Sequence, residues 1–433
     1  MGHRLSGKKK KKSGTEHLYK GRLEITRSGI GFVVVENKNQ DILVRPNDFS
    51  TALHGDIVRV RVANQYPKSG RMQGEVVEVV SRKQMEFSGR VEISPTFAFF
   101  ISEAEKPMPD IYIPLDKLKE AKNNDRVIVR IVDWPKNKKP QGEVVQVIDS
   151  SDENDLAMKD ILLENGFPIL FPETVIEESE RLPNIIGESE ISSRKDLRSL
   201  LTFTIDPFDA KDFDDAISFR KLNNGIYEIG VHIADVSHFV RPETELDKEA
   251  YTRATSVYLP DRVNPMLPEQ ISNELCSLKP HEDRLTFSVI FQISPKSEIK
   301  QYWLGKTVIH SDHRFTYEEV QEIIEQKDGI HSEEILIVNE LAQRFRRYRF
   351  KKGAINFSST EVRFKLDEKG KPIGIIVKEN KEAHQLVEEF MLLANKTVAE
   401  YVAKMKIHKK PVPFPYRIHD TPDKEKLLPF MEF

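Results

Sequence analysis

Aspartates crowd one short stretch of this chain, in the run Thr204-Ile-Asp206-Pro-Phe-Asp209-Ala-Lys-Asp212-Phe-Asp214-Asp215. Apolar residues flank the stretch on both sides, around Phe203 and around Ile217, so we expect it to be half-buried. Like charges repel, and carboxylates gathered in such a setting need a counter-charge. A hard divalent cation such as Mg²⁺ suits them, because it takes carboxylate oxygens and shares substrate phosphates. The stretch therefore predicts metal-assisted chemistry at phosphorus.

The spacing within the stretch indicates which acids can act together. In an extended segment Asp212 and Asp214 share one face, and Asp215 points away from it. Asp206 ends a preceding predicted strand, and it reaches the same pocket if the intervening loop folds back. A cluster of this kind can hold one or two Mg²⁺ ions, which activate water and stabilise the leaving oxygen of an in-line displacement.

The residues of the acidic stretch leave alternatives to a magnesium site open. A solvated acidic loop is the plain structural alternative. An EF-hand is disfavoured, because the central glycine and the terminal glutamate spacing are absent. A nucleophilic Asp-x-Asp pair of the haloacid-dehalogenase type is conceivable at Asp212 and Asp214, although the barrels predicted upstream make it the poorer account.

An internal repeat occupies the first third of the chain. Gly21-Arg-Leu23 recurs as Gly89-Arg-Val91, an offset of 89 − 21 = 68, and Asp41-Ile-Leu-Val44 recurs as Asp110-Ile-Tyr-Ile113, an offset of 110 − 41 = 69. Each unit alternates apolar and polar residues in short runs separated by turn residues, which is typical of a small five-stranded barrel of the OB or cold-shock type.

Aromatic residues lie among charged ones in both predicted barrels, with Phe32 in the first and Phe97 in the second. Rings on a barrel face stack nucleic-acid bases, and neighbouring Lys and Arg follow the phosphates. We therefore predict that Phe32 and Phe97 bind RNA; the alternative for any one of these rings, including Phe99 and Phe100, is a place in the core.

The chain divides by composition into a basic tail at 1–14, barrels at 15–82 and 83–150, an acidic helical linker at 151–199 and an α+β domain at 200–433. We expect the linker to pack on the domain that follows it. Within the α+β domain, strands are predicted at 200–206, 215–220, 226–236 and 285–293, and helices at 316–326, 333–351 and 383–405.

Composition describes an ordinary globular protein of 433 residues with 39% hydrophobic and 31% charged residues, which favours two to four domains. The single cysteine, Cys276, rules out an internal disulfide and fits a reducing cytoplasm. No apolar run approaches the ~18 residues of a membrane span. The basic run Lys8–Lys12 has no apolar stretch after it, so it is not a secretory signal. We expect a cytoplasmic monomer with no membrane partner.

A histidine and a basic cluster each allow two structural roles. His232 lies in a strongly apolar predicted strand, and no second His or Cys stands at zinc spacing, so we predict a core histidine rather than a metal ligand.

Basic residues cluster between Arg344 and Lys352 on a predicted helix; they line a nucleic-acid channel or form a solvated helix face.

In addition to these patterns, the chain resembles the ribonuclease II/ribonuclease R family (RNB exoribonucleases), and ribonuclease R more than ribonuclease II. The resemblance is carried by the acidic stretch and by four later blocks in the same order. They are His232-Ile-Ala-Asp-Val-Ser237, Ser256-Val-Tyr-Leu-Pro260 with Pro265-Met-Leu-Pro268, Leu275-Cys-Ser-Leu278, and Val387-Glu-Glu-Phe-Met-Leu-Leu-Ala-Asn395.

The resemblance implies a Mg²⁺-dependent exoribonuclease that works from the 3′ end of single-stranded RNA and releases nucleoside 5′-monophosphates. It implies that the four catalytic, metal-binding acids are Asp206, Asp212, Asp214 and Asp215, while Asp209 is not among them. Tyr258 matches the tyrosine that packs on the 3′-terminal nucleotide and helps set the size of the final product. Phe357 and Phe364 are both candidates for the aromatic partner on the other side of the bases.

The sequence departs from the family pattern at both ends. It has no N-terminal helix-turn-helix extension, and it stops at Phe433, whereas the family's catalytic domain continues with an arginine-rich segment, a glutamate and an S1 barrel. We therefore expect a fragment or truncated product of a longer protein. Two alternatives to an exoribonuclease stay open: a catalytically incomplete RNA-binding fragment, and a metal-dependent phosphatase acting on small phosphomonoesters.

Overall fold

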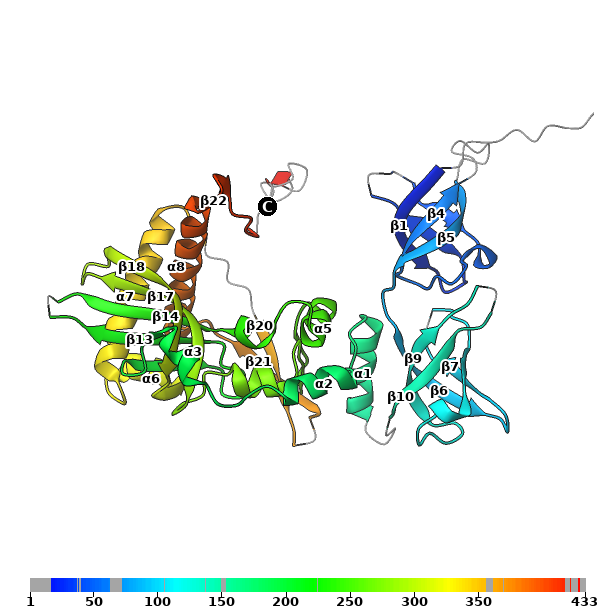
Figure 1. Cartoon of the computed structure of the whole chain (residues 1–433), viewed down its shortest axis with the longest axis horizontal. Coiled ribbons are helices and arrows are strands. Elements are labelled where there is room, and N and C mark those ends of the chain that lie inside the picture. The colour runs from blue at the N-terminus through cyan, green and yellow to red at the C-terminus, as the bar shows by residue number, and fades with distance from the viewer. Residues whose placement is uncertain are drawn as a thin grey trace, which may run out of the picture. The chain divides into compact units, whose positions relative to one another are not determined.

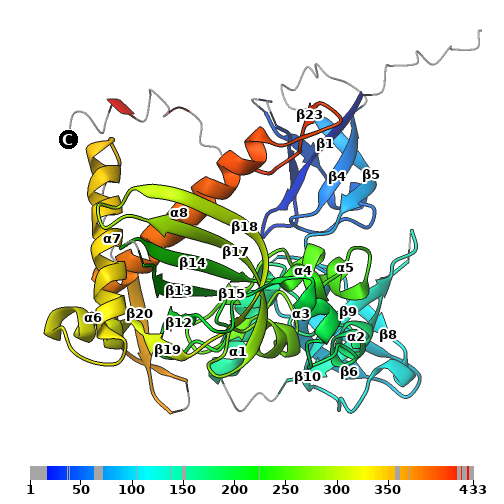
Figure 2. The ribbon, with the colours of Figure 1, turned by 60° about the vertical axis from the view of Figure 1, so that its left-hand side comes forward.

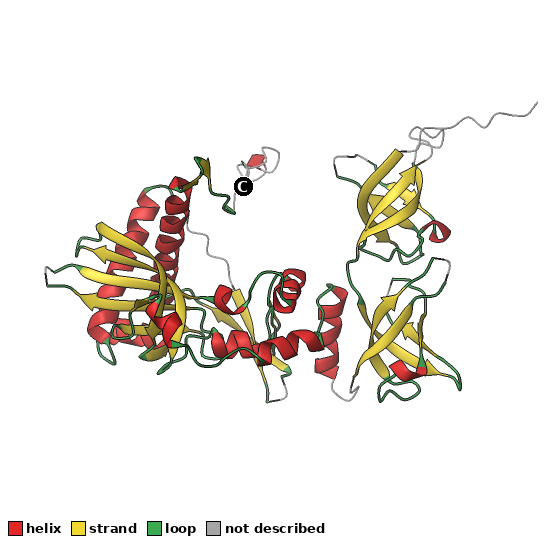
Figure 3. Ribbon diagram, in the orientation of Figure 1, coloured by secondary structure: helices red, strands yellow, loops and turns green. Residues whose placement is uncertain are grey.

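The computed structural model describes residues 17–36, 38, 40–62, 72–104, 106–136, 138–148, 153–223, 225–355, 361–368, 370–416, 421 and 427–428. The predicted basic tail and Phe357 lie outside the described residues. The chain forms two compact units, 1–171 and 172–433. Strands dominate the first unit, and helices and strands mix in the second (Figure 1, Figure 3).

The first barrel closes five strands in the order β1-β2-β3-β5-β4. Its strands are β1 (His17–Ile25), β2 (Gly31–Val34), β3 (Ile42–Val44), β4 (Ile57–Val62) and β5 (Gln73–Ser81), with a 3-10 turn at Pro46–Asp48 before β4. Alternate residues are buried, as in β4, where Val58, Val60 and Val62 lie in the core. Period-two alternation thus gives the barrel its interior.

The second barrel repeats the connectivity of the first, in the order β6-β7-β8-β10-β9. Its strands are β6 (Glu86–Ile93), β7 (Ala98–Ser102), β8 (Ile111–Ile113), β9 (Arg126–Asp133) and β10 (Gln141–Val147), with a 3-10 turn at Leu115–Lys117. The repeated glycine has a packing reason in both barrels. A Cβ on Gly21 would collide with the carbonyl oxygen of Val34, and one on Gly89 with that of Ile101. The predicted duplication of an OB-type barrel is confirmed.

Helix α1 (Glu153–Glu164) packs on the second barrel. Asp160 accepts hydrogen bonds from Ser88 Oγ at 2.6 Å and from Arg126 Nη2 at 2.7 Å, and Leu163 joins a small core with Ile128. The expectation that the whole linker packs on the following domain is therefore wrong for α1. A polar and an apolar contact both tie this helix to the domain before it.

The second unit is built on one seven-stranded sheet, in the order β11-β18-β17-β14-β13-β12-β19 (Figure 2). Its strands are β11 (Lys195–Asp196), β12 (Leu201–Asp206), β13 (Asp215–Lys221), β14 (Tyr227–Ala234), β17 (Asp283–Ile293), β18 (Ile299–His310) and β19 (His313–Thr316). Helices α6 (Tyr317–Gln326), α7 (Ser332–Lys351) and α8 (Glu382–Lys404) share one apolar core with the sheet.

The remaining elements of this unit are short. They are α2 (Glu173–Glu180), α3 (Glu188–Ser192), α4 (Val236–Phe239), α5 (Glu245–Arg253), the hairpins β15 (Val257–Tyr258)/β16 (Val263–Asn264), β20 (Glu361–Leu366)/β21 (Pro372–Lys378) and β22 (Lys406–Ile407)/β23 (Lys410–Pro411), and the π-helix Gln270–Leu275. In the described part of the chain, no helix is long and apolar enough to cross a membrane.

The basic cluster of α7 joins two helices. Arg349 Nη2 lies 2.5 Å from Glu389 and 3.0 Å from Glu388, both on α8, and Arg346 lies 3.5 Å from Glu389. Glu389 is buried. Arg346 and Arg349 therefore connect α7 to α8, whereas Arg347, Lys351 and Lys352 of the same cluster are exposed, as either predicted role of the cluster requires.

Small polar residues line the sheet face that points away from α7 and α8. His232 is fully buried, with Nδ1 2.7 Å from Ser288 Oγ and Nε2 2.8 Å from Ser218 Oγ. Burial lowers the pKa of this imidazole to about 3, so it is neutral. The prediction of a hydrogen-bonded core histidine is confirmed, and the histidine links three neighbouring strands.

The close packing around His232 leads to a first prediction. Gly230→Ala places a Cβ against His232 Nε2 and Ser218 Oγ, so we expect a loss of about 1–3 kcal/mol in the free energy of unfolding, measured by chemical denaturation. Gly374→Ala in β21 is the matched control, because its Cβ meets nothing nearer than 3.9 Å. Equal effects of the two substitutions would contradict this role of the glycine in packing.

Candidate active site

The acidic stretch forms the turn between two neighbouring strands of the sheet. Asp206 is the last residue of β12 and Asp215 is the first residue of β13. The strands are antiparallel, with Phe203 opposite Ile217. Because β12 and β13 are paired, the connecting residues 207–214 fold back on themselves. This brings Asp212 and Asp214 to the end of β12, where Asp206 lies.

Burial and mutual repulsion raise the pKa of three of these carboxyls. Desolvation is the largest cause for Asp206, whose pKa rises to about 6. The Thr204 side chain and then Arg314 oppose the rise, and Asp212 and Asp214 add to it. The pKa of Asp215 rises to about 7, through desolvation and then Asp206 and Asp214. Desolvation followed by Asp212 also raises the pKa of Asp214. The acids therefore form one electrostatic group.

The group has the chemistry of a cation site. Asp206 is only 8% exposed, and its Oδ2 has no hydrogen-bond partner in the structure. Nearby carboxylate oxygens, with an unsatisfied buried one among them, fit a hard divalent cation. As the side chains stand, no three His, Cys, Asp or Glu residues in the described ranges are placed to hold a metal ion.

Asp209 pairs with a residue outside this group. Both of its carboxylate oxygens lie 3.2 Å from Nη2 of Arg363 in β20, and both side chains are exposed. An exposed pair of this kind contributes little to stability. Its role in the structure is to connect the acidic loop to the β20–β21 hairpin.

Tyr258 contacts the acidic group from the β15–β16 hairpin. Its hydroxyl donates a hydrogen bond to Asp212 Oδ2 at 3.1 Å, while 66% of the residue is exposed. Desolvation and then Asp212 raise the pKa of Tyr258 to about 12, so the phenol keeps its proton at neutral pH. The ring is thus held beside an acid and remains open to a ligand.

Two residues for which the sequence predicted no role fix the backbone of the loop, although one of them, Ser277, lies in the family-like block Leu275-Cys-Ser-Leu278. Arg314 in β19 donates from Nη2 to the carbonyl oxygens of Pro207 at 2.6 Å and Phe208 at 2.9 Å. Ser277 Oγ donates to the carbonyl oxygen of Lys211 at 2.7 Å and accepts from the amide of Phe213 at 3.0 Å. Arg314 reaches the acidic loop because β19 pairs in parallel with β12. No local sequence pattern predicts this contact.

Tyr317, at the start of α6, is a third neighbour of the acids that sequence reasoning missed. Desolvation, followed by Asp215 and Asp206, raises its pKa to about 12. Its ring stacks on His384 of α8, with the ring centroids 4.1 Å apart.

Cys276 is buried, and desolvation raises the pKa of its thiol to about 12, as suits a structural cysteine.

The candidate aromatic residues occupy different settings. Phe364 lies in β20, is 47% exposed, and follows Arg363, so strand alternation directs it to the face opposite the contact with Asp209. Phe97 is partly exposed on the second barrel, Phe32 is half-buried on the first, and Phe100 is wholly in the core. The core alternative thus holds for Phe100.

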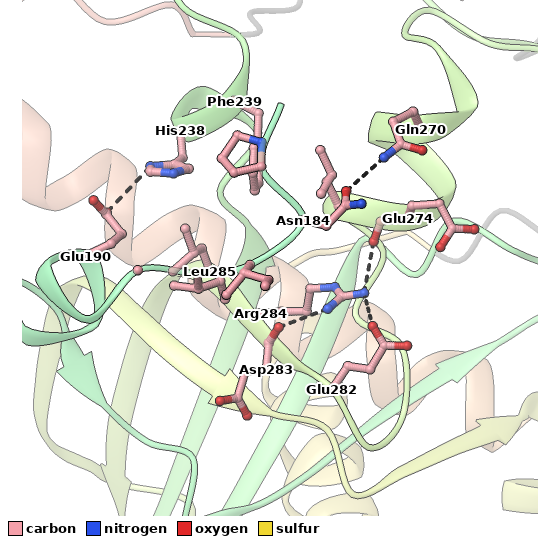
Figure 4. Close-up of a pocket in the computed structure, with 15 residues that line it drawn as sticks. Asn184, Glu190, His238, Phe239, Gln270, Glu274, Glu282, Asp283, Arg284 and Leu285 are labelled. Atoms are coloured by element: carbon pink, nitrogen blue, oxygen red, sulfur yellow. Dashed lines mark hydrogen bonds and ion pairs between the residues drawn. The ribbon is translucent and has the colours of Figure 1, made fainter. Parts of the chain in front are cut away.

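A separate pocket of about 390 Å³ lies between the sheet and the π-helix (Figure 4). Its charged groups contact one another: Arg284 donates to the carbonyl oxygen of Glu274 at 3.0 Å and pairs with Glu282, and His238 lies 3.5 Å from Glu190. None of the four aspartates lines it. A shallower hollow of about 790 Å³ does involve the acidic loop, through Phe208, Lys211 and Phe213.

Comparison with known families agrees with this architecture of two OB-type barrels followed by an α+β domain. The model of the RNB domain matches residues 194–433, the cold shock domain matches 99–172, and the ribonuclease B OB domain matches 21–79. The chain belongs to the RNB family.

Individual relatives extend the comparison. Ribonuclease R of Thermotoga maritima is 39% identical over 422 residues, and that of Aquifex aeolicus is 34% identical over 446 residues. These alignments cover 95% and 98% of this chain, but 58% and 62% of the relatives. The chain therefore spans about three fifths of their length.

Solved structures resemble the chain as well. Mycoplasma genitalium RNase R in complex with ribose-methylated single-stranded RNA has a TM-score of 0.76 and 26% identity, covering 95% of this chain and 65% of that chain. Yeast Ssd1, described as a pseudonuclease, has a TM-score of 0.60 and 20% identity, covering 89% of this chain and 55% of that chain. The likeness to Ssd1 concerns the fold alone, so the fold by itself does not establish catalysis.

The raised acid pKa values predict how stability depends on pH without metal. The folded state holds protons on Asp206 and Asp215 up to pH values of about 6 and 7, above the ordinary value of 3.8. The stabilising effect is present at low pH and is lost as pH rises through this range, so the metal-free protein should lose on the order of 2–4 kcal/mol between pH 5 and 8. Asp215→Asn should flatten this dependence in thermal melts.

Asp209→Asn is the matched control, since Asp209 lies outside the acidic group and pairs with Arg363. We expect its melting curves to follow the wild-type pH dependence. Adding Mg²⁺ to the wild-type protein should also raise the melting temperature most at high pH. An identical pH dependence in Asp215→Asn and wild type would contradict the assignment of Asp215 to the group.

Proposed function

We propose that the protein containing this chain is a 3′-to-5′ exoribonuclease of the ribonuclease R type. It hydrolyses single-stranded RNA from the 3′ end into nucleoside 5′-monophosphates. The observation that carries the proposal is the group of four acids, Asp206, Asp212, Asp214 and Asp215, at one hairpin end of an RNB domain that follows two OB-type barrels. The barrels supply a reason for the substrate to be RNA.

We assign the four aspartates as ligands of Mg²⁺. When bound, divalent cations of this kind activate a water molecule for attack at phosphorus and stabilise charge on the leaving oxygen. The unsatisfied Oδ2 of Asp206 and the oxygen-only donor set support this assignment. The anchors from Arg314 and Ser277 hold the loop backbone, and a fixed backbone keeps the acids close despite their repulsion.

Tyr258 positions the 3′-terminal nucleotide in this proposal. Its exposed ring packs on the nucleotide, and its hydroxyl fixes the orientation of Asp212. Phe357 or Phe364 stacks on the other side of the bases, and Phe32 and Phe97 contact RNA further along the chain. We further propose a monomer in the cytoplasm, with no membrane partner; the buried free thiol of Cys276 fits a reducing compartment.

The decisive test removes one acid and follows cleavage and binding separately. Asp214→Asn in the complete protein should lower Mg²⁺-dependent hydrolysis of a 3′-tailed RNA by at least about 100-fold, because it removes a charged metal ligand. Binding to the same RNA, measured without divalent cation, should not weaken. Asp209→Asn should cleave at a near wild-type rate, and near wild-type cleavage by Asp214→Asn would overturn the metal-site assignment.

Tyr258 gives a second test in which the readout is product length. Tyr258→Ala should lengthen the final RNA product, because the terminal nucleotide loses the ring that holds it at the acids. Tyr258→Phe keeps the ring and loses only the hydrogen bond to Asp212, so we expect wild-type product length with a reduced rate. Denaturing gels of end-labelled RNA measure both. The same product pattern from all three proteins would contradict this role.

The two competing functions predict different outcomes in the same assays. An RNA-binding module without catalysis binds the 3′-tailed RNA and leaves it intact at every Mg²⁺ concentration. The similar fold of yeast Ssd1, a pseudonuclease, is the observation that favours this alternative. A metal-dependent phosphatase hydrolyses small phosphomonoesters and shows no preference for RNA.

A further inference from the structure

The β15–β16 hairpin, which carries Tyr258, is too short to fix its own orientation. Its two strands pair at two positions, Val257 with Asn264 and Tyr258 with Val263. Even a longer hairpin on its own is only marginally stable in water. The ring of Tyr258 nevertheless has a definite place, because its hydroxyl donates to Asp212 Oδ2 at 3.1 Å. Contacts outside the two strands must therefore help to hold the hairpin beside the acids.

Arg253, the last residue of α5, supplies such contacts at the base of the hairpin. Its Nε donates to Glu249 Oε1 at 2.7 Å, one turn earlier in the same helix. Its Nη1 donates to Asn264 Oδ1 at 3.3 Å and to the carbonyl oxygen of Pro265 at 3.3 Å. Asn264 lies in β16, the strand that pairs with the strand of Tyr258. One guanidinium group therefore ties helix α5 to the hairpin.

The base of the hairpin is closed to solvent, whereas its ring is open. Arg253 is 4% exposed and Asn264 is 8% exposed, against 66% for Tyr258. Moving a buried guanidinium away from its partners costs free energy, so the base of the hairpin favours one arrangement. Arginine suits this place, because its planar fork donates to several acceptors at once, and the compact ammonium of lysine does not reproduce that fork.

Helix α5 is itself fixed, so it can serve as a support for the hairpin. Leu246 in its first turn is fully buried, and the amide of this residue donates to Glu178 Oε2 of α2 at 3.1 Å. Thr244 caps the N-terminus of α5, where its hydroxyl accepts from the amide of Asp247 at 3.2 Å. The position of Arg253 is thus set by the packing of the helix and not by the hairpin.

We propose that Arg253 is a positioning residue: by clamping the base of the hairpin to α5, it places Tyr258 beside the acids and thereby sets the length of the final RNA product. The inference rests on the proposed function, in which Tyr258 packs on the 3′-terminal nucleotide. Arg253 acts through the ring and not on the RNA. Displacement of a positioning group by about 1 Å is enough to slow a reaction strongly.

Two substitutions in the complete protein loosen the clamp from opposite sides. Arg253→Lys keeps the charge next to Glu249 and loses the fork, and Asn264→Ala removes the acceptor in the hairpin. Both should lengthen the final product of a 3′-tailed RNA towards the length that Tyr258→Ala gives. Arg181→Lys is the matched control, since Arg181 lies 2.7 Å from Glu177 at the same helical spacing but is exposed on α2. We expect it to give products of wild-type length.

A double variant separates loss of position from a general loss of stability. If Arg253 acts through the ring, Arg253→Lys combined with Tyr258→Ala gives the same product length as Tyr258→Ala alone, since coupled residues are not additive. Stacking is followed directly with an RNA that carries 2-aminopurine at its 3′ end, bound without divalent cation. Arg253→Lys should quench its fluorescence less than wild type does, and thermal melts check that each variant is folded.

Wild-type product length in both clamp variants would overturn this role of Arg253, and so would further lengthening in the double variant. If Arg253→Lys does not fold, the product length of Asn264→Ala decides. Wild-type products from Tyr258→Ala would overturn the role of the tyrosine in the proposed function, and this inference with it. A changed product from Tyr258→Ala with unchanged products from the clamp variants overturns the inference alone, so the two failures are distinguishable.

Discussion

The burial of mutually repelling carboxylates at one hairpin end is the constraint on which the second unit depends. Asp206 and Asp215 occupy adjoining strand ends, and burial and neighbouring charge raise both pKa values well above the ordinary one. A loop carrying such charge would swing outward if it were free. Hydrogen bonds from Arg314 and Ser277 to the loop backbone hold it instead, and the charge of Arg314 also lowers the pKa of Asp206. These hydrogen bonds fix the backbone of the loop that carries the acids.

The rest of the unit supports this arrangement from two sides of one sheet. On one face α6, α7 and α8 bury an apolar core that includes Phe203 and Ile205, the residues leading to Asp206. On the other face His232 joins Ser218 and Ser288, so the central strands are linked through side chains as well as backbone. Buried, fully paired polar groups of this kind specify strand register. A shift of register would displace the acids.

Much of the architecture could be predicted from local patterns. The duplicated barrels, the helices around 316–326, 333–351 and 383–405, and the strands that hold the acids all appear close to their predicted bounds. Strand β18, which pairs with the preceding strand β17, was not predicted, and other errors arose where partners are distant in sequence. Helix α1 binds the barrel before it, the arginines of α7 pair with α8, and β19 with its Arg314 was not predicted.

The sequence by itself determined the acids and their spacing, the barrel repeat and the apolar periodicity, because each is a pattern within a short segment. It also separated Asp209 from the other aspartates through the family motif, and the pairing with Arg363 is consistent with that separation. The family motif marked Tyr258, which contacts Asp212, but tertiary structure decided which other groups surround the acids. Arg314, Ser277 and Tyr317 lie far along the chain from Asp206, and only the pairing of strands across the sheet and the packing of helices on it brings them there, since non-local contacts leave no periodic signal in the sequence.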